Sequence, residues 1–125
     1  MQIMNNGSYL TFGLSAAILD ELRLVFSRFS AVDRVLIYGS RARGDFRPGS
    51  DIDLLVLAPT MAAPELARLW MALDDLPIIF RLDVSLCQEV DNPKLMRNML
   101  ADGVTLYQGV AAVSPAPVSP ADPRP

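Results

Sequence analysis

The sequence predicts an α/β (α+β) domain in which a small mixed β-sheet is flanked by helices. Three observations support this prediction. Apolar residues recur at intervals of three and four in three separate segments, which is typical of helices with one buried face. Short apolar runs of strand length lie between these segments, and glycine or proline stands at most of the boundaries. The chain has 125 residues, 51% of them hydrophobic, which is enough for the core of one compact domain.

The first half of the chain predicts one helix followed by two strands. The helix covers about residues 15–29, the first strand covers residues 35–38, and the second covers about residues 51–58. Gly39 ends the first of these strands, and Pro59 stops the second. The apolar face of the helix, which we expect to pack on the sheet, is formed by Ile18, Leu22, Val25, Phe26 and Phe29.

The second half predicts two further helices and two further strands. A helix with Pro64 in its first turn precedes a strand over residues 78–86. That strand changes from continuously apolar to alternating, which places Asp83 on a polar face of the sheet. The last helix begins after Asn92 and ends at Gly103, where we expect the left-handed conformation that glycine favours. A short edge strand follows.

The two ends of the chain differ from the predicted domain, which spans residues 14–108. Residues 1–13 form an N-terminal extension. Residues 109–125 form a proline-rich tail, which we expect to be disordered because proline prevents helix formation and large apolar groups are scarce.

The composition excludes several kinds of chemistry. Without histidine there is no Ser-His-Asp or Cys-His catalysis and no histidine-bound zinc, and the single cysteine, Cys87, allows no intrachain disulfide. A net charge of −3 argues against direct nucleic-acid binding, which normally needs a basic surface. No apolar run approaches the roughly 20 residues that span a bilayer, and the N-terminus lacks a signal-peptide pattern. We therefore expect a cytoplasmic protein without membrane contact.

A pair of acids predicts a metal site at the start of the second strand. Residues two apart in a strand face the same way, so Asp51 and Asp53 point to one side while Ile52 points into the core. Two neighbouring carboxylates repel each other, and a divalent cation removes the repulsion. Mg²⁺ favours a few carboxylates together with phosphate oxygens and water.

A third acid would turn this metal site into a catalytic one. Transfer of a phosphoryl or nucleotidyl group needs an acid that accepts the proton of the attacking hydroxyl. Asp83 is the candidate, provided that its strand lies beside the strand of Asp51 and Asp53. Asp45 and the Asp74-Asp75 pair are weaker candidates, because they fall in loop or helix-end positions where acids are usually solvated.

A glycine and a serine directly after the first strand predict a phosphate-binding turn. Gly39 has no Cβ, so its backbone can approach a phosphate closely, and Ser40 adds a hydroxyl donor. Arg41 and Arg43 follow and are expected to steady a triphosphate or the leaving pyrophosphate. The alternative for the arginines is a solvated loop, and the alternative for the Gly-Ser pair is an ordinary turn.

At these residues the chain resembles the minimal nucleotidyltransferase (MNT) family of the DNA polymerase β-like nucleotidyltransferase superfamily. The family pattern is Gly-Ser, ten residues, Asp-x-Asp and a third Asp on a later strand. This chain has Gly39-Ser40, then Asp51-Ile52-Asp53, then Asp83. The resemblance covers roughly residues 14–108 and includes the flanking segments Arg41-Ala42-Arg43-Gly44 and Asp102-Gly103-Val104-Thr105-Leu106-Tyr107.

The resemblance implies transfer of AMP from ATP to a hydroxyl, with release of pyrophosphate. It implies that Asp51 and Asp53 hold two Mg²⁺ ions, that Asp83 binds one of them and activates the acceptor, and that Gly39 and Ser40 bind the triphosphate. Many MNT proteins are antitoxins that adenylylate a tyrosine of a partner HEPN-domain ribonuclease toxin. The resemblance therefore implies a HEPN toxin as the partner of this chain, in a homo- or hetero-oligomer whose composition stays open.

Two other functions remain open from the sequence. The domain could neutralise a toxin by binding alone, in which case its acids are dispensable. It could also transfer a nucleotide to a small molecule, as antibiotic-modifying relatives do with an additional helical domain that is not visible in this chain.

Overall fold

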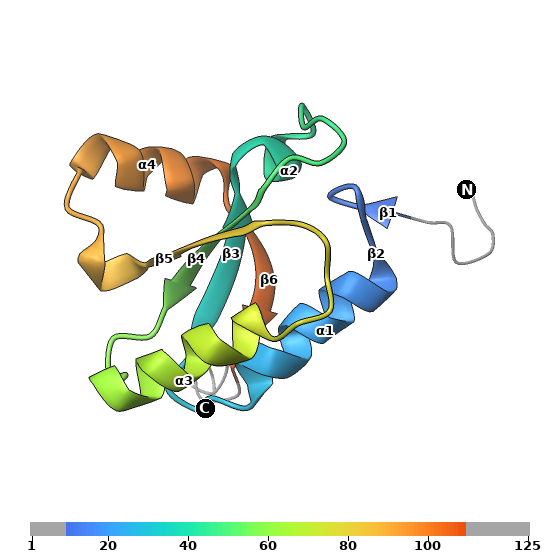
Figure 1. Cartoon of the computed structure of the whole chain (residues 1–125). Coiled ribbons are helices and arrows are strands. Elements are labelled where there is room, and N and C mark those ends of the chain that lie inside the picture. Colours follow the sequence, from blue (N-terminus) through green and yellow to red (C-terminus); the bar gives the residue numbers. More distant parts are fainter. Residues whose placement is uncertain (1–9, 110–125) are drawn as a thin grey trace, which may run out of the picture.

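The fold centres on one four-stranded sheet (Figure 1). The computed structural model describes residues 10–109, so the predicted tail beyond Gly109 and most of the predicted N-terminal extension lie outside the described residues. Its elements are β1 (Leu10–Thr11), β2 (Leu14–Ser15), α1 (Ala16–Ser27), β3 (Arg34–Tyr38), α2 (Gly39–Arg43), β4 (Ile52–Leu57), α3 (Ala63–Asp74), β5 (Leu82–Leu86), the 3-10 turn η1 (Cys87–Glu89), α4 (Pro93–Asp102) and β6 (Val104–Gln108).

The sheet is mixed, as the sequence predicts. Its strand order is β5-β4-β3-β6. Strand β3 pairs antiparallel with both β4 and β6, whereas β4 and β5 run parallel. The predicted α/β class is therefore confirmed, and the last strand lies at an edge as expected. The short hairpin of β1 and β2 forms a separate two-stranded sheet.

Helices cover both faces of the sheet, and alternation along the strands decides which side chains they meet. Helices α1 and α3 pack on one face, where Ile37 and Leu54 belong to the main core. Helix α4 packs on the other face, where Leu36, Leu55 and Met99 form a smaller cluster. Neighbouring residues of β3 and β4 thus point to opposite sides, so Tyr38, Asp53 and Leu55 share the face of α4.

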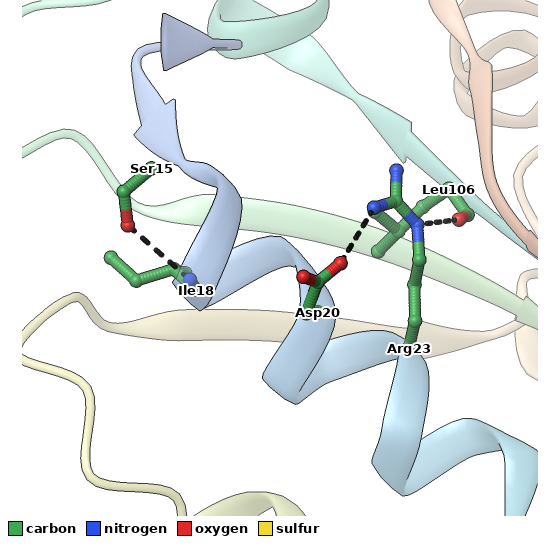
Figure 2. Close-up of polar contacts among 5 residues, drawn as sticks. All are labelled: Ser15, Ile18, Asp20, Arg23 and Leu106. Carbon is green, nitrogen blue, oxygen red and sulfur yellow. Dashed lines mark hydrogen bonds and ion pairs between the residues drawn. The ribbon is translucent and has the colours of Figure 1, made fainter. Parts of the chain in front are cut away.

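Helix α1 spans residues 16–27, where the sequence predicts about 15–29, and two side-chain contacts hold it in place. The side chain of Ser15 caps it by accepting a hydrogen bond from the amide of Ile18 at 3.3 Å. Figure 2 shows this cap together with Arg23, whose Nε donates to the carbonyl oxygen of Leu106 at 2.8 Å. The Arg23–Asp20 ion pair beside it is exposed, so it contributes little. The bond to Leu106 is the useful one, because it fixes α1 to the edge strand β6.

The C-terminus of α4 corrects one prediction. Gly103 has φ −66° and an extended backbone, so the expected left-handed conformation is wrong. Glycine fits here because there is no space for a side chain. A Cβ at this position would lie 2.8 Å from the carbonyl oxygen of Met99 and 3.0 Å from Leu36 Cδ1. The glycine lets the chain turn tightly from α4 into β6.

Strand β5 is shorter than the sequence predicts. It begins at Leu82, whereas residues 78–80 are irregular and Ile79 is 94% exposed. The reason lies in its neighbour, because β4 begins only at Ile52, whose amide bonds to the carbonyl oxygen of Arg81. Residues before Arg81 therefore have no residues of β4 to pair with. None of the helices within residues 10–109 has the length and apolar character needed to cross a membrane.

Candidate active site

Three polar residues form a row across the sheet. Asp53 of β4 pairs in register with Asp83 of β5, and on its other side Asp53 pairs with Tyr38 of β3. Side chains of paired residues point to the same face, and adjacent strands lie about 4.8 Å apart. The expected adjacency of the two acidic strands is thus confirmed. We refer to Tyr38, Asp53 and Asp83 as the acidic row.

Asp51 joins the acidic row from just outside the strand. It directly precedes β4 and is half-buried. Its charge acts on the neighbouring carboxyl: burial raises the pKa of Asp53, and Asp83 and Asp51 raise that pKa further, against smaller opposing effects of Arg43 and Arg41. The raised pKa means that negative charge at Asp53 is not fully compensated by the protein. This is the electrostatic condition that a bound cation relieves.

The close approach of α2 to Asp53 explains the glycine at its start. Gly39 has φ +73°, a conformation that L side chains rarely adopt. A Cβ on Gly39 would also lie 2.5 Å from Oδ2 of Asp53. The glycine therefore lets α2 begin close to the carboxylate of Asp53. Ser40 follows as the second residue of α2 and is half-buried. Phosphate binding by Gly39 and Ser40 stays a prediction.

The two arginines predicted to bind triphosphate point in different directions. Arg43 is at the surface, where Nη1 lies 2.9 Å from Asp102 Oδ2 and Nε lies 3.2 Å from Asp45 Oδ2. These contacts link α2 to the end of α4. Arg41 is buried, and its guanidinium contacts backbone carbonyls and aromatic rings. Triphosphate contacts of both arginines remain predictions that this arrangement does not test.

Tyr38 is a member of the site that none of the sequence motifs singles out. Burial raises the pKa of its hydroxyl, and the charges of Asp83 and Asp53 raise it further, while a hydrogen bond with Ser85 lowers it. The hydroxyl therefore stays protonated beside the carboxylates. Alternation along β3 is enough to predict that Tyr38 faces the side of the sheet away from the core-facing Ile37. That it lies beside Asp53 follows only from the pairing of β3 with β4.

The acidic row is open rather than a preformed cage. Within residues 10–109, no group of three or more His, Cys, Asp or Glu side chains is arranged closely enough to hold a metal ion. An apolar groove of about 460 Å³ lies at the other end of β4, between Leu57, Pro59 and Cys87, and it contains none of the row. The oxygen-only donors of Asp51, Asp53 and Asp83 nevertheless suit a hard cation such as Mg²⁺.

The fold and the acidic row define a nucleotidyltransferase domain of α/β class. The sequence model of the family "Polymerase beta, Nucleotidyltransferase" matches residues 20–109, and the chain belongs to this family.

Solved structures agree on the fold. A protein described as a minimal nucleotidyltransferase superposes with a TM-score of 0.57 at 29% sequence identity, covering 78% of this chain and 98% of that one. A crystal structure of a toxin–antitoxin with AMP-PNP gives a TM-score of 0.54 at 19% identity, covering 74% of this chain and 75% of that one. No curated protein sequence matches the chain significantly.

Proposed function

We propose that this protein is a Mg²⁺-dependent nucleotidyltransferase that transfers AMP from ATP to a tyrosine hydroxyl of a HEPN-type toxin and thereby acts as its antitoxin. The observation that carries the proposal is the register of the acidic row, which puts Asp83 directly beside Asp53 with Asp51 two residues away along the chain. Family membership supports nucleotidyl transfer in general. The similarity to a toxin–antitoxin crystallised with AMP-PNP supports ATP and a toxin as partners.

The residues fit a magnesium site because their charges are uncompensated. Burial raises the pKa of Asp53, the charges of Asp83 and Asp51 raise it further, and a cation bound by these carboxylates would remove the repulsion between them. Asp51 and Asp53 would bind two Mg²⁺ ions, and Asp83 would share one of them. The ions would supply stabilisation of the charge that develops on the phosphate oxygens and a lower pKa of the attacking hydroxyl.

The protein's own groups account for binding, orientation and proton transfer. Backbone amides at the start of α2, with the hydroxyl of Ser40, would hold the triphosphate beside the acidic row. Asp83 would accept the proton of the acceptor hydroxyl. A bond then forms between the acceptor oxygen and the α-phosphorus, the bond from that phosphorus to the bridging oxygen breaks, and pyrophosphate leaves. The lone Tyr38 hydroxyl keeps its proton and so does not add charge to the row.

A transfer assay tests this function. The protein is incubated with ATP labelled on the α-phosphate, Mg²⁺ and a HEPN-type toxin, and label on the toxin is measured. We expect Asp53→Asn and Asp83→Asn to lower transfer at least about 100-fold, because each removes a carboxylate needed in the transition state. Asp75→Asn is the matched control, since Asp75 is exposed at the end of α3. Absence of transfer by the wild-type protein would overturn the proposal.

Neutralisation of the toxin in cells separates catalysis from binding. If Asp53→Asn still binds the toxin but no longer rescues growth, transfer is the neutralising step. If this variant rescues growth as well as the wild type, the protein neutralises by binding alone. Transfer of label to a small hydroxylated molecule, and not to the toxin, would assign the third function that the sequence leaves open.

A further inference from the structure

Arg41 lies in α2 but points away from solvent. In the part of the chain that the structure describes, it is the one charged side chain that is buried, with 2% of its surface exposed. Burial of a charged group is costly unless its hydrogen-bond donors are satisfied. Burial accordingly lowers the pKa of Arg41, and the charge of Asp53 opposes that effect. The contacts of the guanidinium explain how the fold tolerates this residue.

Three N–H groups of Arg41 donate to backbone carbonyls. Nε and Nη2 both donate to the carbonyl oxygen of Ser50, at 3.1 and 2.8 Å. Nη1 donates to the carbonyl oxygen of Phe12, at 3.0 Å. Ser50 is the residue directly before Asp51, so a forked bond from α2 fixes the backbone at the entrance of the acidic strand. The bond to Phe12 connects the hairpin of β1 and β2 to the same guanidinium.

The guanidinium of Arg41 also lies over two aromatic rings. Its central carbon lies 5.0 Å from the ring centre of Phe46 and 4.8 Å from that of Phe80, within the range of cation–π attraction. Phe80 stands three residues before Asp83 in the chain. The next residue, Arg81, accepts the amide hydrogen bond of Ile52 at 2.8 Å, which joins the entrances of β5 and β4. Arg41 therefore contacts the segments that lead into both acidic strands.

We propose that Arg41 is a positioning residue that holds the entrances of β4 and β5 together, so that Asp51, Asp53 and Asp83 face one site. The inference rests on the proposed function, because the site that it positions is the site of nucleotidyl transfer. It also differs from the sequence prediction, in which Arg41 steadies the triphosphate. Three of its five N–H groups are engaged within the protein, and its central carbon lies over the rings of Phe46 and Phe80. Lysine has no planar fork to reproduce these contacts.

Steady-state kinetics of Arg41→Met distinguish positioning from triphosphate binding. Transfer to the toxin is measured at varied ATP concentration. We expect kcat to fall about 100-fold, as for a misplacement of catalytic groups by about 1 Å. The KM for ATP should stay within about threefold of the wild type, because no ground-state contact with ATP is removed. Arg47→Met is the matched control: Arg47 is an exposed arginine in the loop that follows α2, and its removal should leave both constants unchanged.

A second measurement does not depend on turnover. Hydrogen exchange of the nucleotide-free protein should be faster in Arg41→Met than in the wild type over residues 44–53, including the amide of Ile52. Arg47→Met should exchange like the wild type there. If the wild-type protein transfers no nucleotide, the proposed function fails, and the exchange result still decides whether Arg41 anchors these segments.

Several outcomes would overturn the proposal. A raised KM with unchanged kcat would make Arg41 a triphosphate ligand. Unchanged hydrogen exchange over residues 44–53 would show that Arg41 does not hold these segments in place. If Arg41→Met does not fold, Arg41→Lys decides, because it keeps the charge and most of the volume. We expect this variant also to lose kcat about 30-fold or more, by the same misplacement. Wild-type kcat in Arg41→Lys contradicts the positioning role.

Discussion

At the residue scale, the raised pKa of Asp53 couples the stability of the fold to pH. Its folded-state pKa is raised, so the folded protein holds this proton more tightly than the unfolded chain does. The associated stability is fully present at pH values below the unfolded pKa, about 3.9, and is lost as the pH rises through the folded value. At neutral pH and without a divalent cation, the charged form of Asp53 therefore destabilises the fold. A cation bound beside Asp53, as proposed, would relieve this destabilisation.

Removal of this charge should stabilise the metal-free protein. In the presence of a chelator at pH 7, we expect Asp53→Asn to raise the melting temperature by roughly 2–4 °C, a shift kept small because Asp53 is only half-buried. The difference from the wild type should shrink as the pH is lowered toward 4, because the wild-type carboxyl then becomes protonated as well. Thermal melts at several pH values measure this. A variant that melts below the wild type at pH 7 would contradict the repulsion.

Gly39 and Gly49 form a matched pair of glycines with positive φ. Gly39 has φ +73° and Asp53 beside it, whereas Gly49 has φ +85° and open space around it. We expect Gly49→Ala to cost about 1 kcal/mol of unfolding free energy through its backbone alone. Gly39→Ala should cost roughly 1–2 kcal/mol more, because its Cβ collides with the carboxylate. Urea unfolding measures both variants.

The second half of the Gly39 prediction concerns coupling. In the double variant Gly39→Ala with Asp53→Ala, the collision is removed and the backbone cost remains. The double variant should therefore be more stable than the sum of the two single effects predicts. If the changes in unfolding free energy of the two single variants add strictly in the double variant, the added Cβ does not collide with the Asp53 side chain.

At the scale of elements, the cap of α4 offers a test of how local sequence sets a helix boundary. Asn92 accepts hydrogen bonds from the amides of Lys94 and Leu95, at 3.0 and 3.2 Å. Asn92→Ala should cost about 1 kcal/mol, because two N-terminal amides lose their partner. Asn98 is exposed within the same helix, and Asn98→Ala should be neutral or slightly stabilising, since alanine is the better helix former. Equal losses in both variants would show that capping has no role here.

The elements also show how far sequence reasoning reaches. Periodicity predicts α1, α3 and α4 and the central strands, because each has an apolar face to bury. It fails at the start of β5, where residues 78–80 are apolar but lack a partner strand. It also misses the hairpin of β1 and β2, whose two-residue strands are too short for any pattern. Pairing partners, not local propensity, decide these cases.

The candidate site divides in the same way. The spacing of Asp51 and Asp53 is local, so alternation predicts their shared face. The position of Asp83 depends on the parallel pairing of β4 with β5, which sequence reasoning could only suppose and which the structure confirms. The burial of Arg41 depends on its contacts with Phe12, Ser50 and Phe80, and no local sequence pattern predicts that these three residues lie around it. Residues whose roles arise from distant segments are those that sequence alone misreads.

At the scale of the whole molecule, the fold places the acidic row beside two helices, α2 and α4. The row lies at the end of the strands next to α2, on the sheet face where α4 packs. Helices α1 and α3 cover the opposite face (Figure 1). Arg43 joins α2 to α4 at the surface, and Arg41 joins α2 to the strand entrances inside. A ligand that binds the row and α2 together should therefore stabilise the whole domain.

This leads to a prediction for ligand binding. Mg²⁺ with a non-hydrolysable ATP analogue should raise the melting temperature, because a ligand present at 100 times its Kd stabilises the folded state by about 2.7 kcal/mol. Either component alone should give a smaller shift, since the carboxylates need the cation and the triphosphate needs both the cation and α2. In Asp53→Asn the combined shift should largely disappear, although this variant is more stable without ligand. Thermal melts over a series of analogue concentrations measure the effect, with Asp75→Asn as the control. An undiminished shift in Asp53→Asn would place the nucleotide away from the acidic row.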